Sequence, residues 1–155
     1  MLTAIGAYQL EEVLKASNRL AERKVPHSVV YMVEPGRFRD PRSRGERTHA
    51  VAARLRTELY PDSASARIFV SHTRPEPLLG ALQPLFTGFN RTVSLGFINH
   101  GGTLNVQGLL TLNRCSWVHI LAQAARILEL PREDLLAAEE LAIVEGKTLP
   151  ETVSA

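Results

Sequence analysis

Short apolar runs alternate with longer amphipathic stretches through most of this 155-residue chain. The short runs are rich in Val, Ile and Phe, which favours strands, whereas apolar residues spaced three or four apart favour helices. Strands that alternate with helices are typical of βαβ units, in which helices cover both faces of a mostly parallel sheet. We therefore expect an α/β fold, a three-layer α/β/α sandwich formed by one domain over residues 1–155. The predicted strands are residues 2–8, 27–33, 66–71 and 92–98, and the predicted helices are residues 9–24, 49–60, 75–86, 113–128 and 134–145.

The composition excludes several classes of protein. Hydrophobic residues make up 45% of the chain and charged residues 22%, as in ordinary globular domains. No apolar run approaches the roughly 18–20 residues of a membrane span, and the N-terminus lacks the basic flank of a signal peptide. The net charge of +2 is too small to indicate nucleic acid binding. A single cysteine, Cys115, excludes an internal disulfide and fits a reducing compartment. We expect a cytoplasmic protein that binds neither membranes nor nucleic acid.

Two of the predicted helices have informative side-chain patterns. Helix 9–24 opens with Glu11 and Glu12 and closes with Arg23 and Lys24, an order that suits the helix dipole. Apolar residues on two faces of helix 113–128 predict that either another part of the chain or a partner subunit covers the face turned away from the sheet. Cys115 is expected to be buried and unreactive. The first apolar stripe is Cys115, Val118, Leu121, Ala122, Ala125 and Leu128, and the second is Trp117, Ile120, Ala124 and Ile127.

Residues 36–47, which we call the arginine loop, contain five arginines and follow the second predicted strand. Guanidinium groups bind phosphate or carboxylate in a bidentate manner, so Arg37 and Arg39 are candidate anion ligands. The alternative is a solvated loop in which Asp40 and Glu46 compensate part of the charge. Open α/β sheets bind their ligands beyond the carboxyl ends of strands, which is where this loop begins.

The third and fourth predicted strands also end in polar residues that suit an anion. His72 and Arg74 follow the third strand, and His100 and Thr103 follow the fourth. Between the latter two, Gly101 and Gly102 would let backbone amides approach an anion closely, or they simply form a tight turn. The ends of three strands therefore predict an anion-binding cleft.

Motifs of catalysis and metal binding are missing from the sequence. It contains no Gly-x-Ser-x-Gly, no P-loop, no Gly-x-Gly-x-x-Gly, no Cys-x-x-Cys and no His-Glu-x-x-His. His119 lies in helix 113–128, where a histidine is more often a hydrogen-bonded structural group than a catalyst. No orienting carboxylate is visible beside His119 or His100.

Three blocks of sequence carry a resemblance to a known family: residues 68–75 (IFVSHTRP), 96–103 (GFINHGGT) and 112–119 (LNRCSWVH). They resemble the C-terminal domain of thiamine-diphosphate-dependent phosphoketolases, with its Ile-Phe-x-x-His-x-x-Pro, Gly-Tyr-x-x-x-Gly-Thr and Leu-Asn-x-x-x-x-x-His blocks at similar spacing. The first strand and helix, from TAIGAY onward, are similar to those of transketolase C-terminal domains. The chain departs from the pattern at Asn99 and His100, in the arginine loop and in the tail from Glu129. The matched residues are His72, Pro75, Gly96, Phe97, Gly102, Thr103, Leu112, Asn113 and His119.

The resemblance implies a transketolase C-terminal-like fold and a structural role, in which the domain helps to form a homodimer and borders the active site. The enzyme would cleave xylulose 5-phosphate or fructose 6-phosphate with phosphate to give acetyl phosphate. Thiamine diphosphate and Mg²⁺ would bind to other domains of the parent enzyme, and this chain contributes no cofactor ligand. Neither the Gly-Asp-Gly nor the Asn-Asn that hold them is present. The isolated chain is therefore expected to be inactive, and we expect it to be a part of a longer protein.

Two other hypotheses stay open. One is a freestanding regulatory module that binds phosphate, a nucleotide or another anion through the arginine loop, with His72 and the Gly101–Gly102 turn. The other is a small enzyme on the same fold with His119 or His100 as acid–base.

Overall fold

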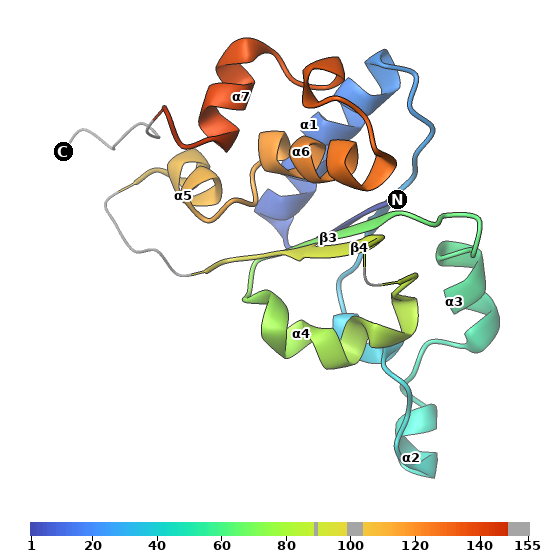
Figure 1. Cartoon of the computed structure of the whole chain (residues 1–155). Coiled ribbons are helices and arrows are strands. Elements are labelled where there is room, and N and C mark those ends of the chain that lie inside the picture. The colour runs from blue at the N-terminus through green and yellow to red at the C-terminus, as the bar shows by residue number, and fades with distance from the viewer. Residues whose placement is uncertain (89, 99–103, 149–155) are drawn as a thin grey trace.

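A four-stranded parallel sheet lies at the centre of the computed structural model, which describes residues 1–88, 90–98 and 104–148 (Figure 1). The strand order is β2-β1-β3-β4, and each neighbouring pair is parallel. All strands therefore end at the same edge of the sheet, which we call the carboxyl edge. The strands are β1 (Leu2–Ile5), β2 (Val29–Tyr31), β3 (Arg67–Ser71) and β4 (Thr92–Leu95).

Helices cover both faces of this sheet (Figure 1). The upper layer contains α1 (Ala7–Glu22), α5 (Val106–Leu112), α6 (Trp117–Leu128) and α7 (Ala138–Val144), with the 3₁₀ turn η3 (Arg132–Asp134) before α7. The lower layer contains α3 (Ala53–Leu59), α4 (Pro75–Leu82) and the 3₁₀ turns η1 (Pro35–Phe38) and η2 (Gln83–Leu85). The short helix α2 (Arg44–Arg47) projects from the lower layer. The predicted α/β class and parallel sheet are confirmed.

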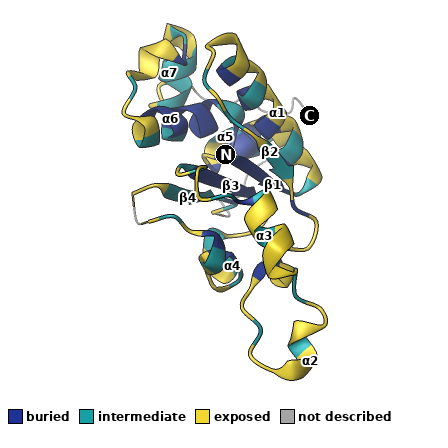
Figure 2. Ribbon diagram, turned by 90° about the vertical axis from the view of Figure 1, so that its right-hand side faces the viewer, coloured by how far each residue is buried: buried dark blue, intermediate teal, exposed yellow. Residues whose placement is uncertain are grey.

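The two faces of the sheet form two separate hydrophobic cores. Side chains alternate along a strand, so Ile68 and Val70 of β3 pack under α1 and α6, whereas Phe69 packs against the lower layer. Every residue of β1 and β3 is buried, as Figure 2 shows. These central strands are mostly apolar on both faces because helices cover both, which explains why the sequence predicts them well.

One charged residue, Arg67, lies inside this frame with only 4% of its surface exposed. Its guanidinium donates to the carbonyl oxygens of Tyr60 and Pro61, at 3.0 and 2.8 Å, and to those of Ala64 and Leu85, at 3.1 and 2.6 Å. Burial lowers the pKa of this guanidinium below its ordinary value. Arg67 thus ties the start of β3 to the segments before and after it.

Several predicted boundaries were wrong. The predicted helix 113–128 begins only at Trp117, as α6, and the helix α5 before it was not predicted. The predicted helix 49–60 begins at Ala53, and the predicted loop before it contains η1 and α2. Helix 9–24 begins two residues earlier, at Ala7.

This last shift changes the role assigned to Glu12. The carboxylate does not open the helix but lies in its second turn, where it is 1% exposed. It accepts hydrogen bonds from the backbone N–H of Trp117 at 2.8 Å and from Lys15 Nζ. The acid therefore caps the first turn of α6, whose N–H groups have no partner within the helix.

The second apolar stripe of α6 is covered by the chain itself. Ile120 and Ala124 are buried among residues of α1 and the tail, and Trp117 and Ile127 pack against the same core. Arg19 of α1 lies over the Trp117 ring at 5.3 Å from its centroid. A partner subunit is therefore not needed to cover this stripe.

Cys115 is fully buried, as predicted, and burial raises the pKa of its thiol to about 12. Among the helices of the described residues, none combines the length and the apolar character that a bilayer crossing requires.

Candidate functional site

The carboxyl edge contains a switch point, where the connections that follow the neighbouring strands β1 and β3 run to opposite sides of the sheet. β1 connects to β2 on one side, and β3, which lies on the other side of β1, connects onward to β4. Ligands of open α/β sheets bind at such a switch point. Here Gly6 adopts φ 119°, and a Cβ on it would lie 2.3 Å from Gln9 Oε1 and 3.0 Å from His72 Nδ1. Only glycine fits between these two side chains.

His72 is held in one orientation at this point. Its Nδ1 is 2.9 Å from the carbonyl oxygen of Ile5, and since a carbonyl can only accept, Nδ1 carries the proton. The ring is exposed, so Nε2 is left as an acceptor facing solvent. Arg74, also exposed, reaches the carbonyl oxygen of Ile98 at 3.5 Å. The two predicted anion ligands that follow β3 are therefore at the edge, on the solvent side.

Contacts join the end of β4 to the turn after β3. A Cβ on Gly96 would lie 2.3 Å from the backbone oxygen of Thr73 and 3.0 Å from Pro75, so the two segments touch with no room for a side chain. The N–H of Phe97 donates to the same Thr73 oxygen at 3.1 Å. Two blocks that are separate in the sequence thus form one unit.

Asn113 connects the third block to this unit. Its Oδ1 accepts from the N–H of Ile98 at 2.8 Å, and its Nδ2 donates to the carbonyl oxygen of Leu109 at 2.8 Å. The side chain is 1% exposed. Asn113 therefore positions the end of β4 against α5 and is not free to bind a ligand.

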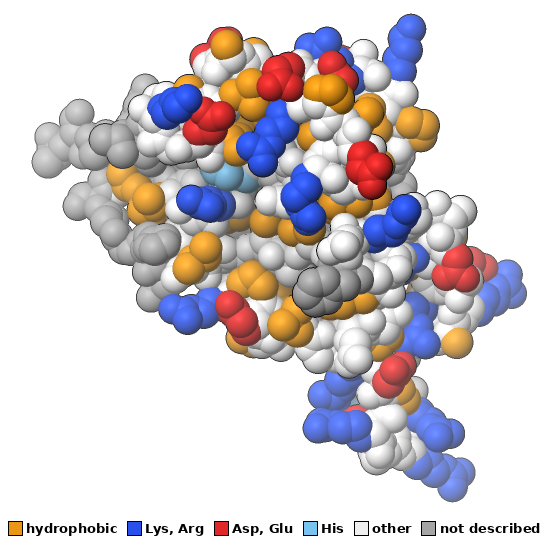
Figure 3. Space-filling model, viewed as in Figure 1, with side chains coloured by type: hydrophobic (Ala, Val, Ile, Leu, Met, Phe, Trp, Pro, Cys, Tyr) orange, Lys and Arg blue, Asp and Glu red, His pale blue; other side chains and the backbone are white. Residues whose placement is uncertain are grey.

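A cavity of about 390 Å³, with a mixed polar and apolar lining, lies beside these contacts, between the end of β4, the α5–α6 turn, α6 and the segments that flank α7. We call it the β4 cavity. Figure 3 shows a histidine surface in a hollow of this face, with Lys and Arg side chains around it. The polar residues that line the β4 cavity are Ser94, Asn113, Arg114, His119, Gln123, Arg132 and Glu145.

His119 is the most buried titratable group in this cavity, at 6% exposure. Its Nδ1 shares a hydrogen bond of 2.8 Å with Ser116 Oγ. Burial, and then the charge of Arg114, lower the pKa of the imidazole to about 4, so the ring is neutral at physiological pH. The partner of His119 is a hydroxyl and not a carboxylate, which does not favour the acid–base hypothesis.

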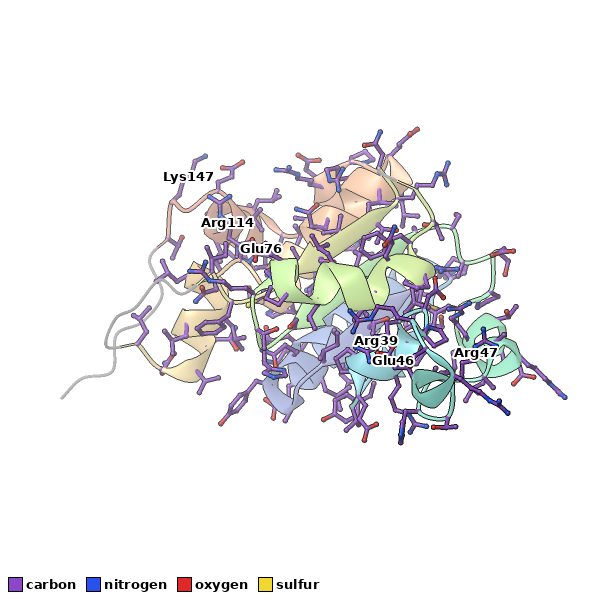
Figure 4. All side chains as sticks on the ribbon, turned by 90° about the horizontal axis from the view of Figure 1, so that it is seen from below. Arg39, Glu46, Arg47, Glu76, Arg114 and Lys147 are labelled. Atoms are coloured by element: carbon purple, nitrogen blue, oxygen red, sulfur yellow. The ribbon has the colours of Figure 1, made fainter. Side chains whose placement is uncertain are left out.

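The arginine loop lies apart from this edge. Figure 4, seen from below, shows Arg39, Glu46 and Arg47 well separated from Arg114 and Glu76. Glu46 forms ion pairs with Arg39 at 3.2 Å and with Arg42 at 3.4 Å, and Arg56 pairs with Asp40 at 2.9 Å. A hydrogen bond from the backbone N–H of Arg42, together with these arginines, lowers the pKa of Glu46. Acidic neighbours thus compensate part of the charge of the loop.

Arg37 is engaged locally as well. Its Nε donates to the carbonyl oxygen of His49 at 2.9 Å, and its guanidinium lies 3.6 Å from the Glu34 carboxylate. The remaining predicted anion ligands, His100, Gly101, Gly102 and Thr103, lie outside the described residues. The structure therefore brings together His72, Arg74, Asn113 and His119 at the carboxyl edge, and places Arg37 and Arg39 away from it.

A larger groove, of about 640 Å³, lies between α1, α5, α6 and α7. Its charged side chains are already paired, since Lys15 bonds Glu12 and Arg19 makes two bonds of 2.9 Å to Glu140. Volume alone does not make it a stronger candidate, because its polar groups are used within the chain.

Sequence reasoning missed five of the seven polar lining residues of the β4 cavity, including Gln123 and Glu145. Ser94, Arg114 and Arg132 come from segments that meet only in the fold. The one local signal was Arg114, next to Asn113 in a matched block. It has φ 56°, the left-handed conformation in which the turn between α5 and α6 is formed.

Comparison with protein-family models gave no match, and no curated protein matches the chain significantly.

Proposed function

We propose that the chain serves as the C-terminal, non-catalytic domain of a phosphoketolase-like enzyme that depends on thiamine diphosphate, with a transketolase C-terminal-like fold. The observation that carries this proposal is the interlocking of the three resembling blocks. Only glycine fits at position 96, because a Cβ there would meet Thr73 and Pro75. Asn113 accepts a hydrogen bond from the N–H of Ile98. Among the matched residues, Pro75, Gly96 and Asn113 thus take part in contacts that join the three blocks.

Exposed apolar side chains at the carboxyl edge support a role in assembly. Tyr8 follows β1 and is 55% exposed, Ile98 follows β4 at 47%, and Val106 begins α5 at 41%. Apolar side chains gathered at one end of a domain are typical of a surface that packs on a neighbour. In the proposed enzyme this edge contacts the thiamine-diphosphate-binding domains and takes part in the homodimer.

The first experiment is a reconstitution. The chain is mixed with, or joined to, the thiamine-diphosphate-binding domains of a phosphoketolase that lacks its own C-terminal domain, and acetyl phosphate formation from xylulose 5-phosphate or fructose 6-phosphate is measured. We expect no product from the chain alone, and product from the assembly only when residues 1–155 are present. Product from the chain alone, or full activity of the other domains without it, would contradict the proposal.

A matched pair of variants tests the contact surface. Tyr8→Asp places a charge at the carboxyl edge and should weaken association with the other domains at least about tenfold. Leu128→Asp is the control, because Leu128 is similarly exposed, at 41%, but ends α6 at the far side of the sheet. Equal effects of the two variants would show that the edge is not the contact.

The alternative function, an anion- or nucleotide-binding regulatory module using the arginine loop, has less support because Arg37 and Arg39 already have partners. Replacing both, as Arg37→Ala with Arg39→Ala, should change the folding free energy little, since exposed ion pairs contribute about 0.2–1 kcal/mol each. Calorimetric titration of the parent and of the double variant with phosphate and with ATP tests this alternative. Saturable binding to the parent that is lost in the double variant would support the alternative function.

A further inference from the structure

His72 lies in the middle of the carboxyl edge, because β3 lies between β1 and β4 in the sheet. The segments on either side of it expose large apolar side chains, Tyr8 after β1 and Ile98 after β4. The residues that contribute most to an interface lie near the centre of the contact surface. The side chains that follow β3 are therefore the ones that select a partner for this edge.

The His72 ring is fixed and presents a hydrogen-bond acceptor. Its Nδ1–H donates to the carbonyl oxygen of Ile5 at 2.9 Å, and Gly6 leaves room for the ring, since a Cβ there would lie 3.0 Å from Nδ1. A neutral imidazole carries one proton, so Nε2 can only accept. The side chain is exposed, and Nε2 has no hydrogen-bond partner among the residues that the structure describes. The ring therefore suits a partner that brings an N–H or O–H group.

Arg74, two residues later, presents the opposite chemistry. Within the described part of the chain, its guanidinium makes one long hydrogen bond, of 3.5 Å, to the carbonyl oxygen of Ile98. It forms no ion pair there, not even with Glu76, the acid nearest to it in the sequence. Guanidinium groups bind carboxylates in a bidentate manner. Arg74 is therefore available to a carboxylate of the partner.

We propose that the carboxyl edge docks on a surface of the thiamine-diphosphate-binding domains that places an N–H or O–H donor opposite His72 Nε2 and a carboxylate opposite Arg74. This inference rests on the proposed function and names the chemistry of the partner surface. Packing of Tyr8 and Ile98 on the partner removes water from both polar groups, and a buried polar group without a partner is costly. The polar contacts thus fix the orientation in which the two surfaces dock.

Two substitutions separate the roles of the two ring nitrogens. Asparagine keeps a donor near the position of Nδ1 but has no atom at the position of Nε2, whereas glutamine keeps an acceptor near Nε2 and loses the donor near Nδ1. His72→Asn should melt at the temperature of the parent and bind the thiamine-diphosphate-binding domains about tenfold more weakly. His72→Gln should melt earlier and bind nearly as tightly as the parent. A histidine with a purely structural role would give the reverse order of affinities.

Substitutions of Arg74 test the second contact. Arg74→Gln removes the charge and should weaken binding about tenfold, whereas Arg74→Lys, which keeps the charge without the bidentate geometry, should lose less. Calorimetric titration of the domains used in the reconstitution measures the affinity of each variant, and thermal unfolding measures its stability. His49→Phe and Arg54→Gln are the matched controls, because both residues are exposed and lie away from the carboxyl edge, His49 just before α3 and Arg54 within it.

The possible results separate this inference from the function on which it rests. Association that no substitution of His72 or Arg74 weakens would overturn the inference and leave the proposed function standing. Equal losses in the two controls would also overturn it, because they would indicate a general effect of surface charge and polarity. Self-association of the chain alone that His72→Asn and Arg74→Gln abolish would place a second copy on this edge instead. No association of the parent would overturn the proposed function, and this inference with it.

Discussion

The carboxylate of Glu12 in α1 accepts a hydrogen bond from the backbone N–H of Trp117, 105 residues later, at 2.8 Å. The first helix thereby supplies the cap of α6, whose own N-cap residue Ser116 makes no capping bond with its side chain. A negative charge at this end is also favoured by the helix dipole. One buried acid thus connects the two longest helices.

Removing this carboxylate should destabilise the fold. Glu12→Ala leaves the Trp117 N–H without its acceptor, and we expect a loss of about 2–4 kcal/mol in the free energy of unfolding. Glu12→Gln keeps an acceptor of the same shape and should lose less. Urea unfolding measures both variants, and Glu11→Ala on the exposed face is the control. Equal values for Glu12→Ala and Glu11→Ala would contradict the capping role.

Arg67 should be irreplaceable by lysine. The guanidinium serves four carbonyl oxygens through three nitrogen atoms, whereas an ammonium group at the end of a lysine side chain cannot reach all four. Arg67→Lys is expected to cost about 2–4 kcal/mol of unfolding free energy, because buried carbonyls lose charged donors. Arg91→Lys, an exposed arginine just before β4, should have no effect in the same thermal and urea unfolding experiments.

Acid should destabilise the protein in two steps, and His119 contributes to the first. The pKa of His119 is lowered to about 4 in the folded protein, whereas in the unfolded chain it titrates near its ordinary value of 6.5. The unfolded state therefore binds the proton first, and stability falls as the pH drops from 6.5 to about 4, by about 2–3 kcal/mol.

Glu140 accounts for part of the second step. Burial opposes its ionisation, but the hydrogen bonds from Arg19 and from the N–H of Ala137 prevail and lower its pKa. Its contribution is lost only as the pH falls below its ordinary value of 4.5. Urea unfolding at pH 7.5 and pH 5.0 therefore separates His119 from Glu140, while the Met1 amine, whose pKa burial lowers, adds a loss of the same sign to the parent and the variant alike. His119→Gln should lose clearly less stability between these values than the parent, and parallel losses would refute the assignment.

Loss of the Asn113 side chain should loosen the end of β4. Asn113→Ala removes the acceptor of the Ile98 N–H and the donor to Leu109, which should cost about 2–3 kcal/mol. Hydrogen exchange gives the specific readout. The Ile98 amide should exchange much faster in the variant, whereas the exchange rates of the β1 amides should not change. Asn18→Ala, on the exposed face of α1, should leave both measurements unchanged.

The strands were predictable because their environment is simple. β1 and β3 are buried on both faces, so most of their residues are apolar, and the pattern can be recognised without knowing what packs on it. α5 was missed although a local signal existed. Asn105 accepts from the N–H of Gly108 at 2.7 Å and is an ordinary N-cap, but Gly108 within the short helix hides the periodicity.

The site residues were less predictable, for physical reasons. His72 and Asn113 belong to blocks that could be recognised, yet the pattern did not distinguish a ligand from a positioning group. The burial of Glu12 and Arg67 depends on partners that only the fold brings near, as does the meeting of Ser94 with Arg132 in one cavity. Charged residues are expected at the surface, so their burial has no sequence signal of its own.

The bonds of Arg19 have a consequence for the order in which the protein forms during synthesis. Arg19 binds the carbonyl oxygen of Leu135 and the carboxylate of Glu140, and it stacks on Trp117. Arg19 leaves the ribosome long before these partners. The side of α1 that carries Arg19 therefore stays exposed to water until Glu140 has been synthesised. The lower layer, whose helices all lie between β2 and β4 in the chain, can fold earlier. The nascent chain thus exposes this surface of α1 longest, and that is the surface that a chaperone would have most to protect.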